Sequence, residues 1–196
     1  MKNKISGLVS GIIAVFFLAV LALVVIDSAN KSRYDLPDYG SIPHFQFIER
    51  SGIPYGKTEM EGKINIVNFF FTSCKGPCPY MNSQVAKLYR KYATSQDVQF
   101  VSISVDPQRD SLSILQNYAT DFGVTDNRWL FLRGPMDEVE ILSEKGFMLG
   151  GELPDLHSTK LILVDSAGHI RGYYNSYNEN SLELLTIRVR ELLKKM

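Results

Sequence analysis

The chain has 196 residues, 45% of them hydrophobic and 11% aromatic, which is ordinary for one packed domain with an appendage. Lysine plus arginine and aspartate plus glutamate number 21 each, so the formal net charge is zero. Because neither this balance nor any basic stripe favours nucleic-acid binding, we expect no nucleic-acid partner.

The first predicted element is a membrane span. Residues 5–26, ISGLVSGIIAVFFLAVLALVVI, carry no charge, and as a helix they would extend roughly 33 Å, enough to cross a bilayer core. Lys2 and Lys4 precede this stretch, which places the following chain outside the cytoplasm. The alternative is a cleaved signal peptide, but such a peptide ends in small residues where this chain has Asp27. The sequence therefore favours an uncleaved anchor.

The predicted organisation is an anchor over residues 1–26, a polar tether over 27–42 and a globular domain over 43–196. Strands are expected at 45–49, 64–71, 98–106, 129–134, 160–165 and 169–175, and helices at 80–93, 110–123, 135–147 and 180–195. This alternation predicts an α/β fold with a mixed central sheet and helices on both faces.

Three details of this pattern can be checked. The segment 64–71, INIVNFFF, is almost continuously apolar, as a central strand covered on both faces would be. Asp110 is the expected N-cap of the second helix, and Asn180 with Glu183 resembles a capping box for the last one. The strand 160–165 is expected beside the strand 64–71.

The two cysteines of the chain, Cys74 and Cys78, stand where the central strand gives way to a helix, in TSCKGPCPYM. A disulfide across so short a loop would stabilise the fold by only roughly 2 kcal/mol, so a structural staple explains them poorly. A helix start favours thiolates, and two positions four apart lie on one helical face. Two interpretations remain open: a redox pair, or two soft ligands of one metal ion.

A third group could complete a metal site. His157 lies just before the strand 160–165, so it could meet the cysteines at one end of the sheet; a loop histidine facing water is the alternative. Two thiolates and one imidazole suit copper, because thiolate prefers Cu(I) and imidazole also accommodates Cu(II). His169 is most simply a surface residue, and His44 a structural or solvated one.

The segments FFFTSCKGPCPYMN, VSISVDPQRDS, WLFLRG and LHSTKLILVDSAGHIRGYY together resemble the SCO/SenC family (synthesis of cytochrome c oxidase) over residues 43–194. The resemblance implies a thioredoxin-like fold, copper bound by Cys74, Cys78 and His157, and assembly of the binuclear copper site of cytochrome c oxidase. The copper-bearing oxidase subunit is then the implied partner. One departure is Lys75, where family members often have proline.

The sequence thus predicts a copper metallochaperone rather than a turnover enzyme. It would cross a bacterial inner membrane once, with the C-terminal domain on the periplasmic side. The alternative is a thiol–disulfide oxidoreductase that keeps the copper-ligating cysteines of the oxidase reduced.

Several other residues have two interpretations each. Asp106 and Arg109 could support the site or merely form a strand-to-helix turn. Asp155 could orient His157 or lie in the loop. Met81 and Met148 are expected in the core rather than as ligands.

Overall fold

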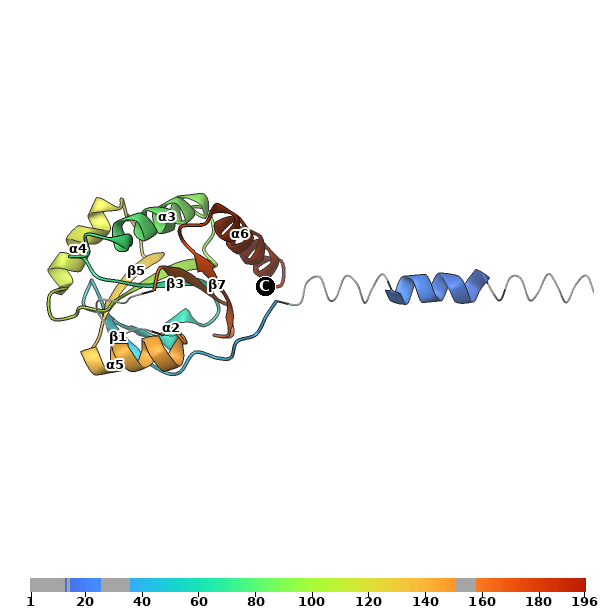
Figure 1. The fold of residues 1–196 in the computed structure, drawn as a ribbon, viewed down its shortest axis with the longest axis horizontal. Helices are drawn as coiled ribbons and strands as arrows, with labels where there is room; N and C mark the ends of the chain where they lie inside the picture. The colour runs from blue at the N-terminus through green and yellow to red at the C-terminus, as the bar shows by residue number, and fades with distance from the viewer. Residues whose placement is uncertain (1–12, 14, 26–35, 151–157) are drawn as a thin grey trace, which may run out of the picture. The chain divides into compact units, whose positions relative to one another are not determined.

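The computed structural model describes residues 13, 15–25, 36–150 and 158–196, and within these ranges one mixed sheet of seven strands forms the centre of the fold (Figure 1). The strand order is β2-β1-β5-β4-β3-β6-β7. The strands are β1 Gln46–Glu49, β2 Pro54–Gly56, β3 Ile64–Phe70, β4 Val98–Ser104, β5 Trp129–Arg133, β6 Lys160–Val164 and β7 Ile170–Asn175.

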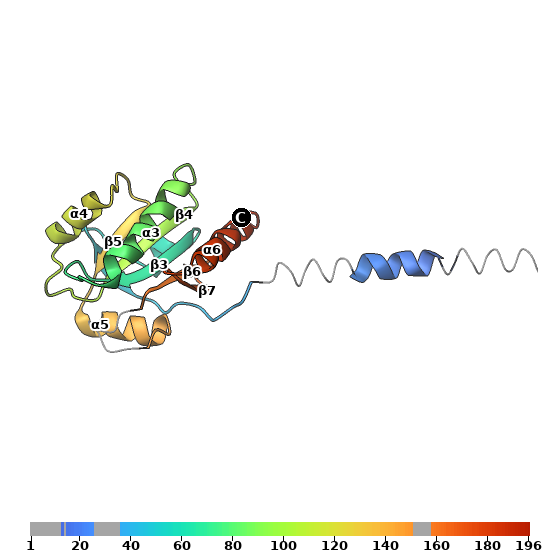
Figure 2. The same ribbon diagram turned by 45° about the horizontal axis from the view of Figure 1, so that its top comes forward.

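Helices cover both faces of this sheet, as the alternation of elements predicted. They are α2 Lys57–Met60, α3 Pro77–Lys91, α4 Leu112–Asp121, α5 Met136–Ile141 with a π-helical continuation at Leu142–Gly146, and α6 Glu179–Leu193. Helices α3, α4 and α6 lie on one side of the sheet and α5 lies on the other, as Figures 1 and 2 show from two directions.

Strand β3 is the predicted central strand, and all seven of its residues are buried. It pairs in parallel with β4 and antiparallel with β6, so the expected neighbourhood of β3 and β6 is confirmed. Successive side chains point to opposite faces of a strand. Phe69 accordingly packs edge-on against Phe147 at 5.4 Å between ring centroids, whereas Phe70 stacks on Tyr118 at 5.2 Å.

The predicted helix caps were wrong by one or two residues. Ser111, not Asp110, is the N-cap of α4, and its hydroxyl accepts from the Ile114 N–H at 3.4 Å. Asn178, not Asn180, caps α6 and accepts from the Ser181 N–H at 2.9 Å. Asp110 is unavailable as a cap because its carboxylate is buried and bonded elsewhere.

The short elements β2 and α2 were not predicted. Strand β2 pairs antiparallel with β1, with Phe47 opposite Tyr55, and α2 follows it directly. Three and four residues are too few for a periodic hydrophobic pattern, so only the pairing with β1 identifies these elements.

Residues 37–196 form one compact unit and residues 1–36 form a separate one. In the unit formed by residues 1–36, residues 15–25 are helical. Among the described residues, no helix combines the length and apolar character needed to cross a membrane. The predicted span, residues 5–26, lies partly outside the described residues.

Candidate metal centre

Cys74 and Cys78 lie at the junction of β3 and α3, both buried, with 8% and 0% of their surface exposed. They are present as two thiols rather than as a disulfide. Cys78 is the second residue of α3, but Cys74 precedes the helix, so the expectation that both stand on one helical face was wrong. The reason is local: the helix begins at Pro77, after the N-cap Gly76.

The loop between the cysteines folds closely over the first thiol. A Cβ added at Gly76 would lie 4.0 Å from the Cys74 Sγ, and the Cys74 N–H donates to the Phe71 carbonyl oxygen at 3.3 Å. The exposed residue Lys75 carries its charge at the outer side of this turn. The backbone therefore holds the Cys74 sulfur against the start of α3.

Burial controls the chemistry of the Cys78 thiol. It raises the pKa of Cys78 to about 12, because desolvation disfavours the thiolate. A backbone hydrogen bond to Phe71 lowers this pKa, whereas the Cys74 thiol and the Asp110 carboxylate raise it further. The sequence had suggested that the helix start would favour thiolates; for Cys78 that expectation was wrong, because desolvation outweighs the helix dipole.

Asp110 is a residue of this centre whose place sequence reasoning missed. Its fully buried carboxylate accepts from the Thr72 N–H at 3.2 Å, the Thr72 hydroxyl at 2.5 Å and the Ser104 hydroxyl at 2.5 Å. Thr72 follows β3 and Ser104 ends β4, and parallel strands end at the same edge of a sheet. Asp110 therefore joins the ends of the two central strands directly beside the cysteine loop.

Asp106 and Arg109 form the turn after β4. Their side chains pair at 3.2 Å, and 72% of the Arg109 side chain is exposed. The Asp106 carbonyl oxygen accepts from the N–H groups of Arg109 and Asp110, at 3.1 and 2.9 Å. These contacts support the turn interpretation of the pair, while the neighbouring Asp110 supports the cysteine loop.

The start of β6 lies at the same edge of the sheet, because β6 runs antiparallel to β3, with Val67 opposite Ile162 and Asn65 opposite Val164. The Ser176 N–H and hydroxyl both donate to the Thr159 carbonyl oxygen there, at 3.2 and 2.7 Å. His157 and Asp155 lie outside the described residues. Within the described chain, no group of three or more histidine, cysteine, aspartate or glutamate side chains could hold a metal ion.

An exposed tyrosine binds the peptide between the cysteines from the outside. The Tyr177 hydroxyl donates to the Pro77 carbonyl oxygen at 3.4 Å, and its ring stacks on that of Tyr80 at 4.4 Å between centroids. The two rings are 49% and 43% exposed. The loop between β7 and α6 is thereby attached to the start of α3.

Tyr118 of α4 is a titratable neighbour of both thiols. Its hydroxyl accepts from the Asn82 side-chain amide at 3.0 Å, and Asn82 lies one helical turn after Cys78. Burial raises the pKa of Tyr118, the bond from Asn82 lowers it, and the nearby Cys78, Cys74 and Asp110 each raise it further. The Tyr118 hydroxyl therefore lies within electrostatic reach of both sulfurs.

The remaining predicted candidates lie elsewhere. His169, expected at the surface, has 37% of its side chain exposed and bonds Asp38 through Nδ1 at 2.9 Å. His44 is exposed, which agrees with the solvated alternative of the two predicted for it. Met81 is fully buried, as expected for the core, but Met148 is 49% exposed, so its expected place in the core was wrong.

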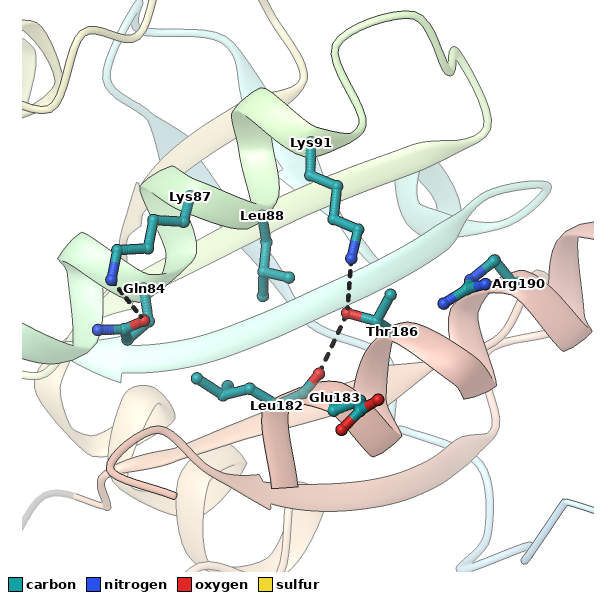
Figure 3. A pocket seen from close by; sticks show the side chains of 8 residues that line it. All are labelled: Gln84, Lys87, Leu88, Lys91, Leu182, Glu183, Thr186 and Arg190. Carbon is teal, nitrogen blue, oxygen red and sulfur yellow. Dashed lines mark hydrogen bonds between the residues drawn. The ribbon is translucent and has the colours of Figure 1, made fainter. Parts of the chain in front are cut away.

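A surface groove of about 340 Å³ lies between α3 and α6, away from the cysteines (Figure 3). It is lined by Gln84, Lys87, Leu88, Lys91, Leu182, Glu183, Thr186 and Arg190. Lys91 and Arg190 lie in the last turns of their helices, where cations interact favourably with the helix dipole. Because Cys78 lies in the first turn of α3, this groove is separate from the candidate centre.

Fold and site together define a thioredoxin-like protein with a buried dithiol at a strand-to-helix junction. The family model described as SCO1/SenC matches residues 38–194, and the chain belongs to this family. The family resemblance drawn from the sequence is thus confirmed.

Known members give the scale of the similarity. The SCO1 protein homolog of Bacillus subtilis is 28% identical over 178 residues, covering 87% of this chain and 88% of the relative. The solved structure of BsSco, described as a cytochrome c oxidase assembly protein with a disulfide switch, is 24% identical with a TM-score of 0.70, covering 81% and 96% of the two chains. Yeast Sco1 solved with copper bound is 22% identical with a TM-score of 0.63, covering 77% and 89%.

Proposed function

We propose that this chain is a membrane-anchored copper-binding protein that delivers copper to the binuclear copper site of cytochrome c oxidase. The observation that carries the proposal is the buried pair Cys74 and Cys78 at the end of the central strand, in a chain of the SCO1/SenC family. Within that family, yeast Sco1 was solved with copper bound, and BsSco is described as an oxidase assembly protein.

The donor set fits the metal. Thiolate sulfur is a soft ligand that selects Cu(I), and a neighbouring imidazole accommodates Cu(II) as well. Cys74 and Cys78 would hold copper, together with His157 as third ligand. Burial of both thiols excludes water, and the Asp110 bonds to Thr72 fix the strand end that carries the loop. Copper here is a cargo, so the protein must bind it and also release it to its partner.

The location follows from the N-terminal sequence. The uncharged stretch 5–26 behind Lys2 and Lys4 supports a single uncleaved span in a bacterial inner membrane, with the C-terminal domain on the periplasmic side. The copper-bearing oxidase subunit would then meet the protein on that side of the membrane.

The second candidate function is thiol–disulfide exchange with the copper-ligating cysteines of the oxidase. It is favoured by the same dithiol and by the disulfide switch named for BsSco. The raised pKa of Cys78 makes this thiol a poor nucleophile, so Cys74 would be the attacking sulfur in such an exchange. Copper binding would use both sulfurs, and the metal displaces the thiol proton of Cys78 as it binds.

Metal content tests copper binding first. The intact chain, purified in detergent and reduced, is loaded with Cu(I) or Cu(II) beside Cys74→Ser, Cys78→Ser and His157→Ala. Each serine variant should lose stable copper binding, and His157→Ala should weaken Cu(II) strongly and Cu(I) less. His169→Ala, which removes an imidazole paired with Asp38, is the matched control and should bind like the unmodified chain. Serine variants that retain copper would end the proposal.

Oxidase activity then separates delivery from redox chemistry. In cells at limiting copper, His157→Ala should lower oxidase activity, and added copper should restore part of it. A purely redox role would tolerate this substitution, because the dithiol remains intact. Activity equal to that of the unmodified strain, at equal protein abundance by immunoblot, would favour the thiol–disulfide function instead.

A further inference from the structure

A series of hydrogen bonds crosses the core from Trp129 of β5 to Tyr118 of α4, whose titratable neighbours include both cysteines. The Trp129 indole N–H donates to the Ser102 hydroxyl at 2.9 Å, which donates to the Asn68 carbonyl oxygen at 2.7 Å. The Asn68 amide donates to the Asn82 carbonyl oxygen at 2.9 Å, and the Asn82 amide donates to the Tyr118 hydroxyl at 3.0 Å. Four of these residues are each 0% exposed: Trp129, Ser102, Asn68 and Asn82.

Trp129 and Ser102, at the end of the series farthest from Tyr118, set the direction in which each of these hydrogen bonds is donated. An indole N–H can only donate, so Ser102 accepts from Trp129 and keeps one hydrogen to donate. If the oxygen and nitrogen of both amides exchanged places, the Asn68 nitrogen would donate to the Ser102 hydroxyl, which already accepts from Trp129. The hydroxyl hydrogen of Ser102 would then be buried without an acceptor, which is costly. In the favourable arrangement each amide presents oxygen toward Ser102 and nitrogen toward Tyr118.

This arrangement determines where the hydroxyl hydrogen of Tyr118 points. Because the Tyr118 hydroxyl accepts from Asn82, its own hydrogen is directed away from that amide. Stacking on Phe70 fixes the ring at the end of β3, and the bond from Asn82 holds the oxygen beside α3. Asn82 follows Cys78 in that helix by one turn. The titratable neighbours of the Tyr118 hydroxyl are Cys78, Cys74 and Asp110, and the Asp110 carboxylate already accepts three hydrogen bonds from Thr72 and Ser104. That leaves the sulfur atoms of the cysteine pair as acceptors for this hydrogen.

We propose that Tyr118 is a positioning residue for the Cys74–Cys78 pair: its hydroxyl donates to a cysteine sulfur, and Ser102 fixes that direction through Asn68 and Asn82. A hydrogen bond to sulfur stabilises the reduced pair relative to the disulfide, because a disulfide sulfur is the poorer acceptor. The same bond would lower the energy of the thiolate electrons when the pair holds copper. Only the copper readout below rests on the proposed function.

The test uses the intact chain in detergent and needs no metal for its main readout. Dithiothreitol is equilibrated with the Cys74–Cys78 disulfide, and two electrons and two protons pass from the reagent to the two sulfurs. Tyr118→Phe should lower the equilibrium constant for reduction by about threefold to tenfold, the effect of one hydrogen bond. Tyr89→Phe is the control, since it removes another buried hydroxyl, which accepts from the Thr125 N–H at 3.3 Å.

The distal variant is Ser102→Ala, which removes the group that orients Asn68 and should shift the same equilibrium in the same direction by a smaller factor. Ser143→Ala, at a buried serine of the helix segment after α5, should not shift it. Circular dichroism and thermal unfolding select variants that remain folded; if Ser102→Ala does not fold, Tyr118→Phe against Tyr89→Phe still decides.

The copper-loaded protein gives a second signature. In Tyr118→Phe the sulfur-to-Cu(II) charge-transfer band should move to longer wavelength, because the sulfur electrons rise in energy without the donor. A Tyr118→Phe protein whose reduction equilibrium matches that of Tyr89→Phe would overturn the proposal. A shifted equilibrium in a protein that binds no copper would instead support Tyr118 and contradict only the proposed function. A folded Ser102→Ala without a shift would overturn the orienting role of Ser102.

Discussion

The Thr72 hydroxyl donates to the Asp110 carboxylate at 2.5 Å, across a separation of 38 residues in the chain. The Thr72 backbone N–H donates to the same carboxylate at 3.2 Å, so Asp110 binds both donors of the residue that leads from β3 into the cysteine loop. A buried carboxylate that accepts three hydrogen bonds is a rigid link, because each partner loses its bond if the group moves.

Replacing this carboxylate should therefore destabilise the domain. Asp110→Asn keeps the shape but turns one acceptor into a donor that faces a hydroxyl or an N–H. We expect the free energy of unfolding to fall by about 2 kcal/mol, the range for a hydrogen bond to a charged group. Urea unfolding followed by tryptophan fluorescence measures this change.

Arg109→Gln is the matched control for Asp110→Asn, because it removes an adjacent charge whose side chain is 72% exposed. An exposed ion pair contributes about 0–1 kcal/mol, so this variant should unfold close to the unmodified protein. Equal stability of the two variants would show that the Asp110 bonds do not hold the strand ends together.

Tyr177 should restrain the cysteine loop from outside. Tyr177→Ala removes both the bond to the Pro77 carbonyl oxygen and the stacking on Tyr80. Because both cysteines are buried, alkylation requires local opening, and a loosened loop should raise its rate several-fold. Iodoacetamide labelling of the reduced protein, followed by mass spectrometry, gives the rate.

Tyr39→Ala is the comparison for this measurement. Tyr39 is also 49% exposed and also contacts a tyrosine, Tyr173, at 5.3 Å between ring centroids. It lies on the segment before β1, and its loss should leave the alkylation rate unchanged. If the two variants label equally fast, the contact between Tyr177 and Pro77 is incidental to the cysteine loop.

The centre of the sheet could be predicted from the sequence because its signal is local. The apolar run 64–71 identified β3, and the position of the cysteines after it identified the edge that holds the candidate centre. The partners of Asp110 could not be predicted in this way. An aspartate just before a helical pattern is explained equally well as a cap, and only the pairing of β3 with β4 brings it to Thr72.

Asn68 is a residue whose sequence position indicates a buried polar contact. It is the amide in the middle of an apolar central strand, where a buried polar group needs partners. Those partners, Ser102 on β4 and Asn82 on α3, are 34 and 14 residues away in the chain. The sequence could therefore indicate that a buried polar contact exists, but not that it leads to Tyr118.

The predicted anchor can be tested directly. A reporter that is active only outside the cytoplasm, fused after Met196, should be active, because Lys2 and Lys4 precede the uncharged stretch 5–26. The protein should also remain in the membrane fraction. Recovery of a soluble mature form that begins near Asn30 would show that the segment is a cleaved signal peptide.

The last prediction concerns pH and follows from the raised pKa of Cys78, about 12. Between about pH 6 and 8 this thiol is protonated, and Cu(I) binding to its sulfur must displace the proton. Protons therefore compete with copper, and the apparent Cu(I) affinity should rise with pH by about tenfold per unit for each displaced proton. Competition against a Cu(I) chelator, corrected for the proton linkage of the chelator itself, measures this slope. A slope near zero would mean that Cys78 does not bind the metal as a thiolate. A slope of one or more, lost together with tight binding in Cys78→Ser, is the result expected if the buried thiol is a ligand.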